Sequence, residues 1–358
     1  MQNKKIVLYS DPKVGLGENA FLALLEDELH RLGVHIVPSY KYLIYERLAL
    51  GQGRAIFVFH LHFPDWVIQN SKILTFKKAI MLTFQLLLAL LLNIKIVRTV
   101  HDFGPLHTSN DKLNHFLQKF IYNLASKCIF LSRSSRDRYF EIFRIQKDRS
   151  EKNIAIPLPG YGCHYPNRIT KDQARNILNI KPDKFVVLLF GSLKPYKHAI
   201  ETTALFHRLL STNLVLLIVG RPHPIFFDHK SFFKAVDNDP RILCIPKSIP
   251  VDEVQIYLNA SDILLLPYQT EQTCGSGVLM LAFDFKIPVL ARRNSYCNDL
   301  LKGSENILFE TDEELCDILK TIQDRDLNSA KKFMLDEAVK YSPSVIAKRY
   351  LEEIYGNL

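Results

Sequence analysis

Short apolar segments alternate with longer amphipathic segments along almost the whole of this chain of 358 residues. The apolar segments are rich in Val, Ile, Leu and Phe, as in residues 5–10 (KIVLYS) and 184–190 (KFVVLLF). Strands that are apolar along their full length are typical of parallel sheets covered on both faces by helices. The pattern therefore predicts an α/β protein. Strands are expected at residues 5–10, 34–38, 55–60, 95–101, 128–132, 184–190, 213–219, 242–245, 263–267, 287–291 and 306–309.

A stretch without strand or helix periodicity divides this pattern at residues 150–170, which contain three prolines and two glycines, as a linker does. We therefore predict two doubly wound, Rossmann-like domains, at residues 1–165 and 166–335. Because open α/β sheets bind ligands beyond the carboxyl ends of their strands, a site is expected in a cleft between them. Helices are expected near residues 18–32, 74–92, 111–126, 133–145, 197–211, 251–260, 276–285, 311–323 and 327–355.

The net charge of +9 is confined to the first half of the chain. Residues 1–165 carry 22 Lys and Arg against 13 Asp and Glu, whereas residues 166–358 carry 24 of each. This asymmetry suggests an anionic surface or ligand for the first domain. No basic motif interleaved with aromatic residues supports a nucleic-acid partner.

The six cysteines are scattered, with no CxxC pair, which favours small buried hydrophobic residues in a reducing compartment. The first residues run directly into a strand pattern, with no apolar signal region. We therefore expect a cytoplasmic protein, with the inner face of the plasma membrane as a candidate location.

Residues 79–92 (AIMLTFQLLLALLL) form an apolar run of 14 residues, shorter than the roughly 20 that a spanning helix needs. Lys77 and Lys78 precede it, as would suit a helix lying on an anionic membrane surface. A core helix packed on a sheet is the more ordinary alternative.

Histidines follow two of the expected strands of the first half. His60 and His62 come after the third strand together with Trp66, and His101 and Asp102 come after the fourth. A histidine beside a carboxylate could exchange a proton or orient a substrate hydroxyl. The histidine pair lacks a third ligand at helical spacing, so zinc is not expected.

Glycine-containing loops between a strand and a helix are candidate anion sites, because their amides can approach a ligand closely. Their residues are Gly15, Gly17, Gly191, Ser192, Gly275, Ser276 and Gly277. The first loop lacks the complete GxGxxG pattern, so a dinucleotide site is poorly supported.

Cations and polar groups flank the loops of the second half. Lys194 and Lys197 lie just before a helix, and Arg221 ends the next strand, so an anionic ligand such as a diphosphate is favoured. A polar loop that begins at Tyr268 and includes Glu271 and Thr273 precedes the Gly-Ser-Gly segment. Residues 237–239 (DND) match a DxD metal pattern but precede a proline, which favours a surface turn.

In these motifs the chain resembles the group 1 glycosyltransferases of the GT-B fold, which use nucleotide-diphosphate sugars. The resemblance covers nearly the whole chain and rests on an ordered set of segments. They are TVHDFGP at 99–105, FGSLKPYKHA at 190–199, LIVGRP at 217–222, SDILLLPY at 261–268 and GSGVLMLAFDFKIPVLA at 275–291.

The resemblance implies that the second domain binds the donor and the first binds the acceptor, with no metal cofactor. Lys197 matches the lysine that neutralises the donor diphosphate, and His101 matches the histidine near the transferring carbon. Gly275 to Gly277 match the loop that binds sugar and phosphate. Residues 336–358 look like the helix that crosses back to the first domain in this fold.

Several positions depart from the motifs of that family. Ser192 replaces the usual arginine, and His198 replaces the glycine that follows the lysine. The paired glutamates fall near Thr273 and Leu281, with Glu271 as a neighbour. Whether transfer would retain or invert the configuration therefore stays open.

These observations predict a glycosyltransferase that moves a sugar from a UDP- or GDP-sugar to a glycan acceptor, such as a polyprenyl-diphosphate-linked one, in bacterial surface polysaccharide synthesis. The predicted donor-binding residues are the seven loop residues with Lys194, Lys197, Arg221, Tyr268 and Thr273. His60, His62 and Trp66 are assigned to the acceptor, and His101, Asp102 and Glu271 to catalysis. A nucleotide-sugar epimerase of the same fold and an inactive scaffold are the alternatives.

Overall fold

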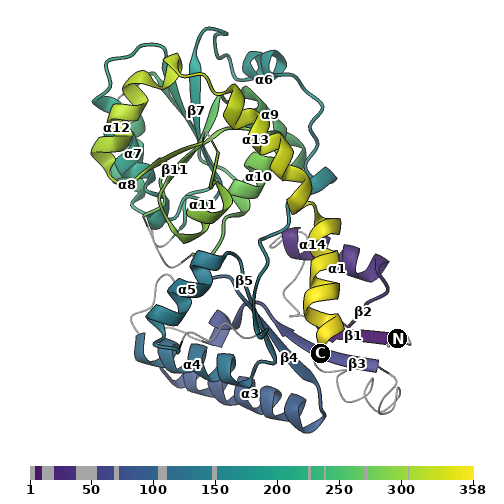
Figure 1. Cartoon of the computed structure of the whole chain (residues 1–358). Coiled ribbons are helices and arrows are strands. Elements are labelled where there is room, and N and C mark those ends of the chain that lie inside the picture. The colour runs from purple at the N-terminus through teal and green to yellow at the C-terminus, as the bar shows by residue number, and fades with distance from the viewer. Residues whose placement is uncertain are drawn as a thin grey trace. The chain divides into compact units, whose positions relative to one another are not determined.

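The computed structural model describes residues 5–9, 20–37, 55–67, 72–103, 111–146, 151–224, 227–237, 239–269, 273–304 and 306–358. Contacts divide the chain into two compact units (Figure 1). Unit 1 comprises residues 1–159, 271–275 and 341–358, and unit 2 comprises residues 160–270 and 276–340. The domain boundaries predicted from the sequence lie at residues 165 and 335.

Unit 1 contains a six-stranded parallel sheet in the order β2-β1-β3-β4-β5-β6. Its strands are β1 (Lys5–Tyr9), β2 (His35–Val37), β3 (Ala55–Leu61), β4 (Lys95–Val100), β5 (Lys127–Phe130) and β6 (Asn153–Ala155). The connecting helices are α1 (Ala20–Arg31), α3 (Lys72–Leu91), α4 (Asp111–Leu124) and α5 (Arg133–Ile142), with a 3-10 turn η2 (Pro64–Val67). Because crossovers between parallel strands are right-handed, α3, α4 and α5 cover one face of the sheet and α1 covers the other.

The C-terminal segment of the chain belongs to unit 1, where α14 (Pro343–Arg349) lies against α1 (Figure 1). A π-helical segment η8 (Tyr350–Ile354) and a 3-10 turn η9 (Tyr355–Asn357) follow. Ile346, Tyr350 and Tyr355 are buried in one cluster with Leu22 and Leu25 of α1. These residues supply part of the unit 1 core, although they come last in the sequence.

The single long helix expected at residues 327–355 is wrong. The segment consists of α13 (Asn328–Ala338), a 3-10 turn η7 (Val339–Tyr341), and then α14, which begins at Pro343. Proline has no backbone N–H and clashes with the preceding turn of a helix, so a helix can begin there but cannot pass through.

Unit 2 contains a second six-stranded parallel sheet, in the order β12-β11-β10-β7-β8-β9. Its strands are β7 (Phe185–Phe190), β8 (Leu214–Val219), β9 (Ile242–Ile245), β10 (Ile263–Leu266), β11 (Val289–Arg292) and β12 (Ile307–Phe309). Its helices, besides α13, are α6 (Lys171–Ile177), α7 (Ala199–His207), α8 (His229–Val236), α9 (Val254–Ala260), α10 (Gly277–Phe285), α11 (Ser295–Leu300) and α12 (Asp312–Thr321). The predicted α/β, doubly wound fold class is therefore confirmed.

The strands of unit 2 are buried along their length, as their continuous apolar sequences predict. In β8, all six residues from Leu214 to Val219 are buried. Three of them, Leu214, Leu216 and Ile218, form one continuous apolar cluster with β7 and the inner faces of α7, α8 and α12. Burial of this kind fixes the positions at which β7 and β8 end, and those ends carry the candidate donor-binding residues.

Among the strands and α-helices that the structure describes, one strand and three helices were not expected from the sequence. The strand β6 is only three residues long and lies within the stretch predicted to be a linker. The helices α6, α8 and α11 are eight residues or shorter, so their periodicity is weak. Each begins at a side-chain cap, with Thr170, Asp228 and Asn294 accepting a backbone N–H from the first turn.

The ends of β7 and β8 approach each other so closely that only glycine fits at residue 220. Its φ is +149°, and a Cβ at this position would lie 2.1 Å from the carbonyl oxygen of Gly191. We expect Gly220→Ala to lower the free energy of unfolding by about 3 kcal/mol, measured by urea denaturation.

Gly303→Ala is the matched control, because Gly303 also has a positive φ (+75°) but has no atom within 4 Å of the added Cβ. It should cost about 1 kcal/mol, the price of backbone strain alone. Equal losses in the two variants would contradict the steric explanation.

Candidate functional site

Three histidines lie together where β3 and β4 of unit 1 end. His60 lies in β3, and His62 and His101 directly follow β3 and β4. Nδ1 of His62 is 3.1 Å from Nε2 of His101. The ring centroids of His60 and His62 are 4.0 Å apart. All three side chains are buried. The structure thus joins the histidines that the sequence assigned separately to acceptor binding and catalysis.

His60 is held at both ring nitrogens by protein groups. Its Nδ1 is 2.7 Å from Oη of Tyr355, and its Nε2 is 2.8 Å from Oγ1 of Thr99. A consistent assignment has the Tyr355 hydroxyl donating to Nδ1 while the Nε2–H donates to Thr99. The geometry gives His60 a structural role, because it ties the C-terminal segment to β3 and β4. Tyr355 lies 295 positions from His60 and had no signal in the sequence analysis.

His101 keeps one ring nitrogen outside this network. Its Nε2 faces His62, which leaves Nδ1 as the atom that can meet a ligand. The ring stacks on Phe63 at a centroid distance of 4.3 Å, which fixes its orientation. His101 is therefore the histidine of the three that is placed to act on a substrate.

Burial keeps this histidine cluster uncharged. Desolvation is the main cause that lowers the pKa of His62 to about 3, and it also places the pKa of His60 and His101 well below their ordinary value. Arg98, buried in β4, adds to all three shifts and donates a hydrogen bond to the backbone oxygen of His62. At neutral pH the cluster can donate or accept single hydrogen bonds but carries no charge.

A short segment ending at Gly275 packs on the same edge of unit 1. The backbone N–H of Cys274 donates to the carbonyl oxygen of His101, and Asp102 pairs with Thr273 in an antiparallel bridge. The Ser135 hydroxyl donates to the carbonyl oxygen of Cys274. Predicted residues Asp102 and Thr273 are thereby brought together, although the sequence assigned them to different domains.

In unit 2, the turn after β7 is paired with the end of β8. The N–H of Leu193 donates to the carbonyl oxygen of Arg221, and the N–H of His223 donates to that of Leu193. This pairing leaves Ser192 and the Arg221 side chain exposed at the strand ends. The guanidinium is thus available beside the glycine turn for an anionic ligand, whereas the Ser192 hydroxyl donates to the Arg221 carbonyl oxygen at 3.5 Å.

Lys197 is the buried cation of this edge. Its Nζ donates to the carbonyl oxygen of Phe190 at 3.0 Å and lies 5.3 Å from the ring centroid of Tyr268. Burial and then the nearby Lys194 ammonium lower the pKa of Lys197 to about 7. A neutral amine in such a place gains a proton readily when an anion arrives.

Gly191 keeps open the space between Lys197 and the first turn of α10. Its φ is +93°, and a Cβ there would lie 2.7 Å from Nζ of Lys197 and 3.2 Å from Cγ2 of Val278. The lysine ammonium and the side chain of Val278, in the first turn of α10, therefore approach the same glycine. A helix N-terminus and a cation that converge on one point form a cradle for a phosphate group.

The start of α10 is fixed by its cap and by the neighbouring linker. Ser276 accepts the N–H of Leu279, and a Cβ on Gly277 would lie 2.4 Å from Oη of Tyr161. Asp284 accepts the N–H of Tyr161 at 2.7 Å, and burial raises the pKa of this carboxyl to about 6. Burial also raises the pKa of Tyr268 well above its ordinary value, which keeps the phenol neutral.

Arg292 is a candidate residue that the sequence analysis missed. It ends β11 and forms an ion pair with Asp312. Its Nη2 lies 3.5 Å from Nδ1 of His198. His198 itself has a φ of +55°, in the left-handed region that favours glycine. This conformation explains why a glycine suits the position in the resembled motif, and it shows that His198 can replace glycine here.

Some predicted residues lie outside the described part of the chain: Gly15, Gly17, Glu271 and the side chain of Trp66. The predicted surface turn at the DxD pattern is occupied by an ion pair, in which Arg241 binds both carboxylate oxygens of Asp239. Among the residues that the structure describes, no three His, Cys, Asp or Glu side chains are grouped to hold a metal ion.

The fold is that of solved GT-B glycosyltransferases, over the full length of the chain. Anabaena Alr3699/HepE in complex with UDP and glucose is 14% identical, with 99% of this chain and 100% of that chain covered and a TM-score of 0.68. Sucrose-phosphate synthase of Thermosynechococcus elongatus is 16% identical, with 99% of each chain covered and a TM-score of 0.69. WaaG, a glycosyltransferase involved in lipopolysaccharide biosynthesis, is 15% identical, with 98% and 100% covered and a TM-score of 0.62.

No protein-family model and no curated protein sequence matches the chain. The likeness is therefore one of fold, and it confirms the GT-B architecture that the motifs implied.

The neutral His62 makes the stability of the protein dependent on pH. Below about pH 6.5 this histidine is protonated in the unfolded chain but stays neutral in the folded chain down to about pH 3, so acid favours unfolding. In His62→Asn, the free energy of unfolding should fall less steeply with acid, by about 1.4 kcal/mol per pH unit. Urea unfolding at several pH values between about 7 and 4 measures this slope.

The exposed His30→Asn is the control, because His30 lies on the exposed side of α1. It should leave the slope of the wild type unchanged. A slope in His62→Asn equal to that of the wild type would show that His62 titrates normally in the folded state.

Proposed function

We propose that this protein is a glycosyltransferase that uses a nucleotide-diphosphate sugar as donor. The observation that carries the proposal is the convergence of Lys197 and the N-terminus of α10 on Gly191. A diphosphate bound there would meet an ammonium, backbone N–H groups and, from the neighbouring strand end, the exposed Arg221. The GT-B fold supports this assignment.

The chemistry of the transfer follows from where charge develops. When the bond from the anomeric carbon to the diphosphate breaks, negative charge grows on the leaving group. Lys197 and the amides of α10 would stabilise that charge, which lowers the barrier. Because Lys197 is buried, its interaction with the diphosphate is screened little by solvent.

Unit 1 would bind the acceptor, with His101 as the residue nearest the reacting hydroxyl. Its Nδ1 is the ring nitrogen not used by His62, so it could hold that hydroxyl or a sugar hydroxyl. If transfer inverts the configuration, a carboxylate such as Asp102 would take the proton of the acceptor. His62 and Phe63 hold the ring of His101 in position.

The solved neighbours suggest the first ligands to test. Two structures of Alr3699/HepE hold UDP and UDP-glucose, and WaaG takes part in lipopolysaccharide biosynthesis. We propose a UDP-hexose such as UDP-glucose as donor, and a lipid-linked glycan of a bacterial surface polysaccharide as acceptor. Such an acceptor would place the enzyme in the cytoplasm, at the inner face of the plasma membrane.

The donor site is tested by replacing Lys197 with methionine, which keeps the length of the side chain but removes its charge. UDP-glucose should raise the melting temperature of the wild type, and Lys197→Met should weaken UDP-glucose binding at least about tenfold. Lys181→Met, on an exposed lysine, is the control and should bind as the wild type does.

The outcomes separate the alternatives. If no nucleotide sugar in a panel of UDP- and GDP-sugars stabilises or reacts with the protein, the transferase proposal fails and a scaffold is left. An isomerised nucleotide sugar formed without acceptor would point to an epimerase instead. Release of UDP that increases with added glycan acceptor would support transfer.

The pH dependence of donor binding follows from the lowered pKa of Lys197. The diphosphate stabilises the charged lysine, so binding takes up a proton when pH exceeds about 7. UDP-glucose affinity should therefore fall above pH 7, approaching about tenfold per pH unit, while it should change little between pH 6 and 7. Calorimetric titration across this range measures it, and Lys197→Met should abolish the dependence.

A further inference from the structure

The helix α3 exposes an apolar face from Leu74 to Leu91. Its exposed large hydrophobic side chains are Leu74, Phe76, Ile80, Met81, Phe84, Leu87, Leu90 and Leu91. Phe76 and Phe84 are 67% and 66% exposed, and a further phenylalanine on α4, Phe116, is 65% exposed. Among the residues that the structure describes, most of the exposed large hydrophobic side chains lie on these two helices. Soluble surfaces seldom carry so continuous an apolar stripe.

The opposite face of α3 is fixed in the core of unit 1. Leu82, Leu86 and Ala89 are at most 1% exposed, and the polar Gln85 is buried with them. The segment Leu74–Leu91 has the length and the mean hydropathy, 1.6, of a membrane span. Because α3 is also the crossover between β3 and β4, it cannot cross a bilayer while it covers the sheet. It can lie along a bilayer surface, over a length of about 30 Å.

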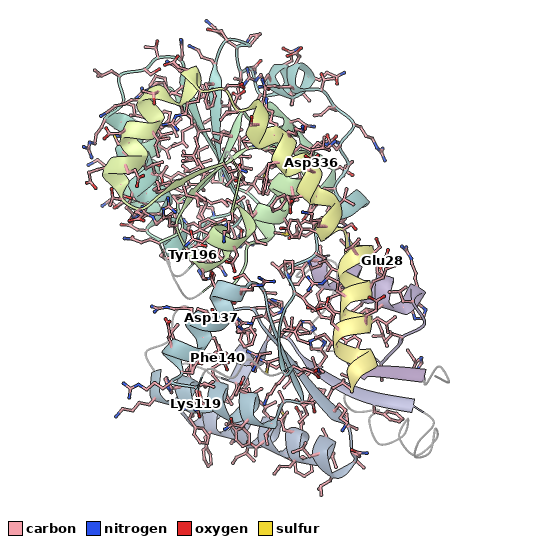
Figure 2. The ribbon with its side chains drawn as sticks, viewed as in Figure 1. Glu28, Lys119, Asp137, Phe140, Tyr196 and Asp336 are labelled. Atoms are coloured by element: carbon pink, nitrogen blue, oxygen red, sulfur yellow. The ribbon has the colours of Figure 1, made fainter. Side chains whose placement is uncertain are left out.

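The charged residues of α3 and α4 are mostly lysines. The helix α3 contains Lys72, Lys77 and Lys78 and no acidic residue. Lys77 is spaced from Ile80 and Phe84 so that it shares their helix face. On α4, Lys112 and Lys119 share a face with the exposed Phe116, and Figure 2 labels Lys119 on this helix. Asp111 is the sole acidic residue of α4.

Unit 1 as a whole also carries a net positive charge. Its residues include 24 Lys and Arg against 16 Asp and Glu, a net charge of +8, whereas unit 2 carries +1. A second copy of the chain on the α3 face would bring lysines against lysines, at an electrostatic cost. An anionic lipid surface offers both an apolar interior for the phenylalanines and counter-charges for the lysines.

From this arrangement we propose that the exposed face of α3, together with Phe116 of α4, docks unit 1 onto an anionic lipid bilayer. The phenylalanine and leucine side chains enter the boundary between headgroups and acyl chains, and the lysines contact the lipid phosphates. This surface lies on the helices that cover the sheet and leaves the strand ends with His62 and His101 uncovered by lipid. The more ordinary alternative, a core helix packed on a sheet, accounts for the buried side of α3 but leaves its exposed apolar side unexplained.

The test is vesicle flotation of the full chain with phosphatidylcholine vesicles, with and without phosphatidylglycerol. The wild type should float with phosphatidylglycerol vesicles and lose binding as salt rises from ~0.1 M to ~1 M, because screening weakens the lysine contacts. Phe76→Gln with Phe84→Gln should lower the partition constant at least about tenfold. Lys77→Glu with Lys112→Glu should reduce binding to anionic vesicles in particular.

Leu210→Gln with Val339→Gln is the matched control, since both side chains are exposed in unit 2, at 95% and 69%. This double variant should float as the wild type does. Absence of binding to anionic vesicles, or equal binding of the phenylalanine double variant, would overturn the proposal. A dimer in solution that the phenylalanine variant converts to monomer would assign the face to a second copy instead.

Vesicle binding and donor binding use different residues, so each can fail alone. Phe76→Gln with Phe84→Gln should keep the UDP-glucose stabilisation of the wild type. A protein that floats with vesicles but binds no nucleotide sugar would contradict only the proposed transferase function.

Discussion

The parallel direction of every described strand is the constraint on which the rest of the structure depends. In a parallel sheet all carboxyl ends meet at one edge, so residues that follow different strands are neighbours whatever their distance in the sequence. His62 and His101 are 39 positions apart and in hydrogen-bond contact for this reason. In the second sheet the same rule brings the turn at Gly191 against Gly220. The parallel strand direction thus determines which residues meet at each candidate site, and the residue types then determine its chemistry.

Burial gives the two edges a common electrostatic character. The histidines of unit 1 and Lys197 of unit 2 all have a pKa below the ordinary value, and desolvation is the largest cause in each case. A buried basic group whose charged form is disfavoured can take up a proton when a ligand brings negative charge. Tyr355 and Thr99 hold both ring nitrogens of His60, and the Phe190 carbonyl oxygen accepts one hydrogen bond from Lys197.

The accuracy of the predictions from sequence depends on the length of each helix or strand. Long apolar runs such as β7 and β8 were predicted within a residue or two, because strands buried on both faces leave little ambiguity. The strand β6 was missed since three residues carry no period. Pro343 itself indicates a helix boundary, but the helical periodicity on both sides of it led to the prediction of one continuous helix. Of the site, the strand-end residues could be predicted from topology, whereas Tyr355 and Arg292 depend on contacts between distant segments that a single sequence does not record.

The segment that ends at Gly275 has a consequence for how this protein can be divided. Thr273 to Gly275 pack with unit 1, while the residues on either side in the chain belong to unit 2, and the C-terminal residues return to unit 1. Neither unit is therefore one continuous stretch of the gene. A fragment cut at the linker near residue 159 would lack the helix that packs on α1 and the segment whose Thr273 pairs with Asp102. Each unit is defined by the packing of several separate chain segments. A recombination event that exchanged one whole unit would therefore need several crossover points in the gene.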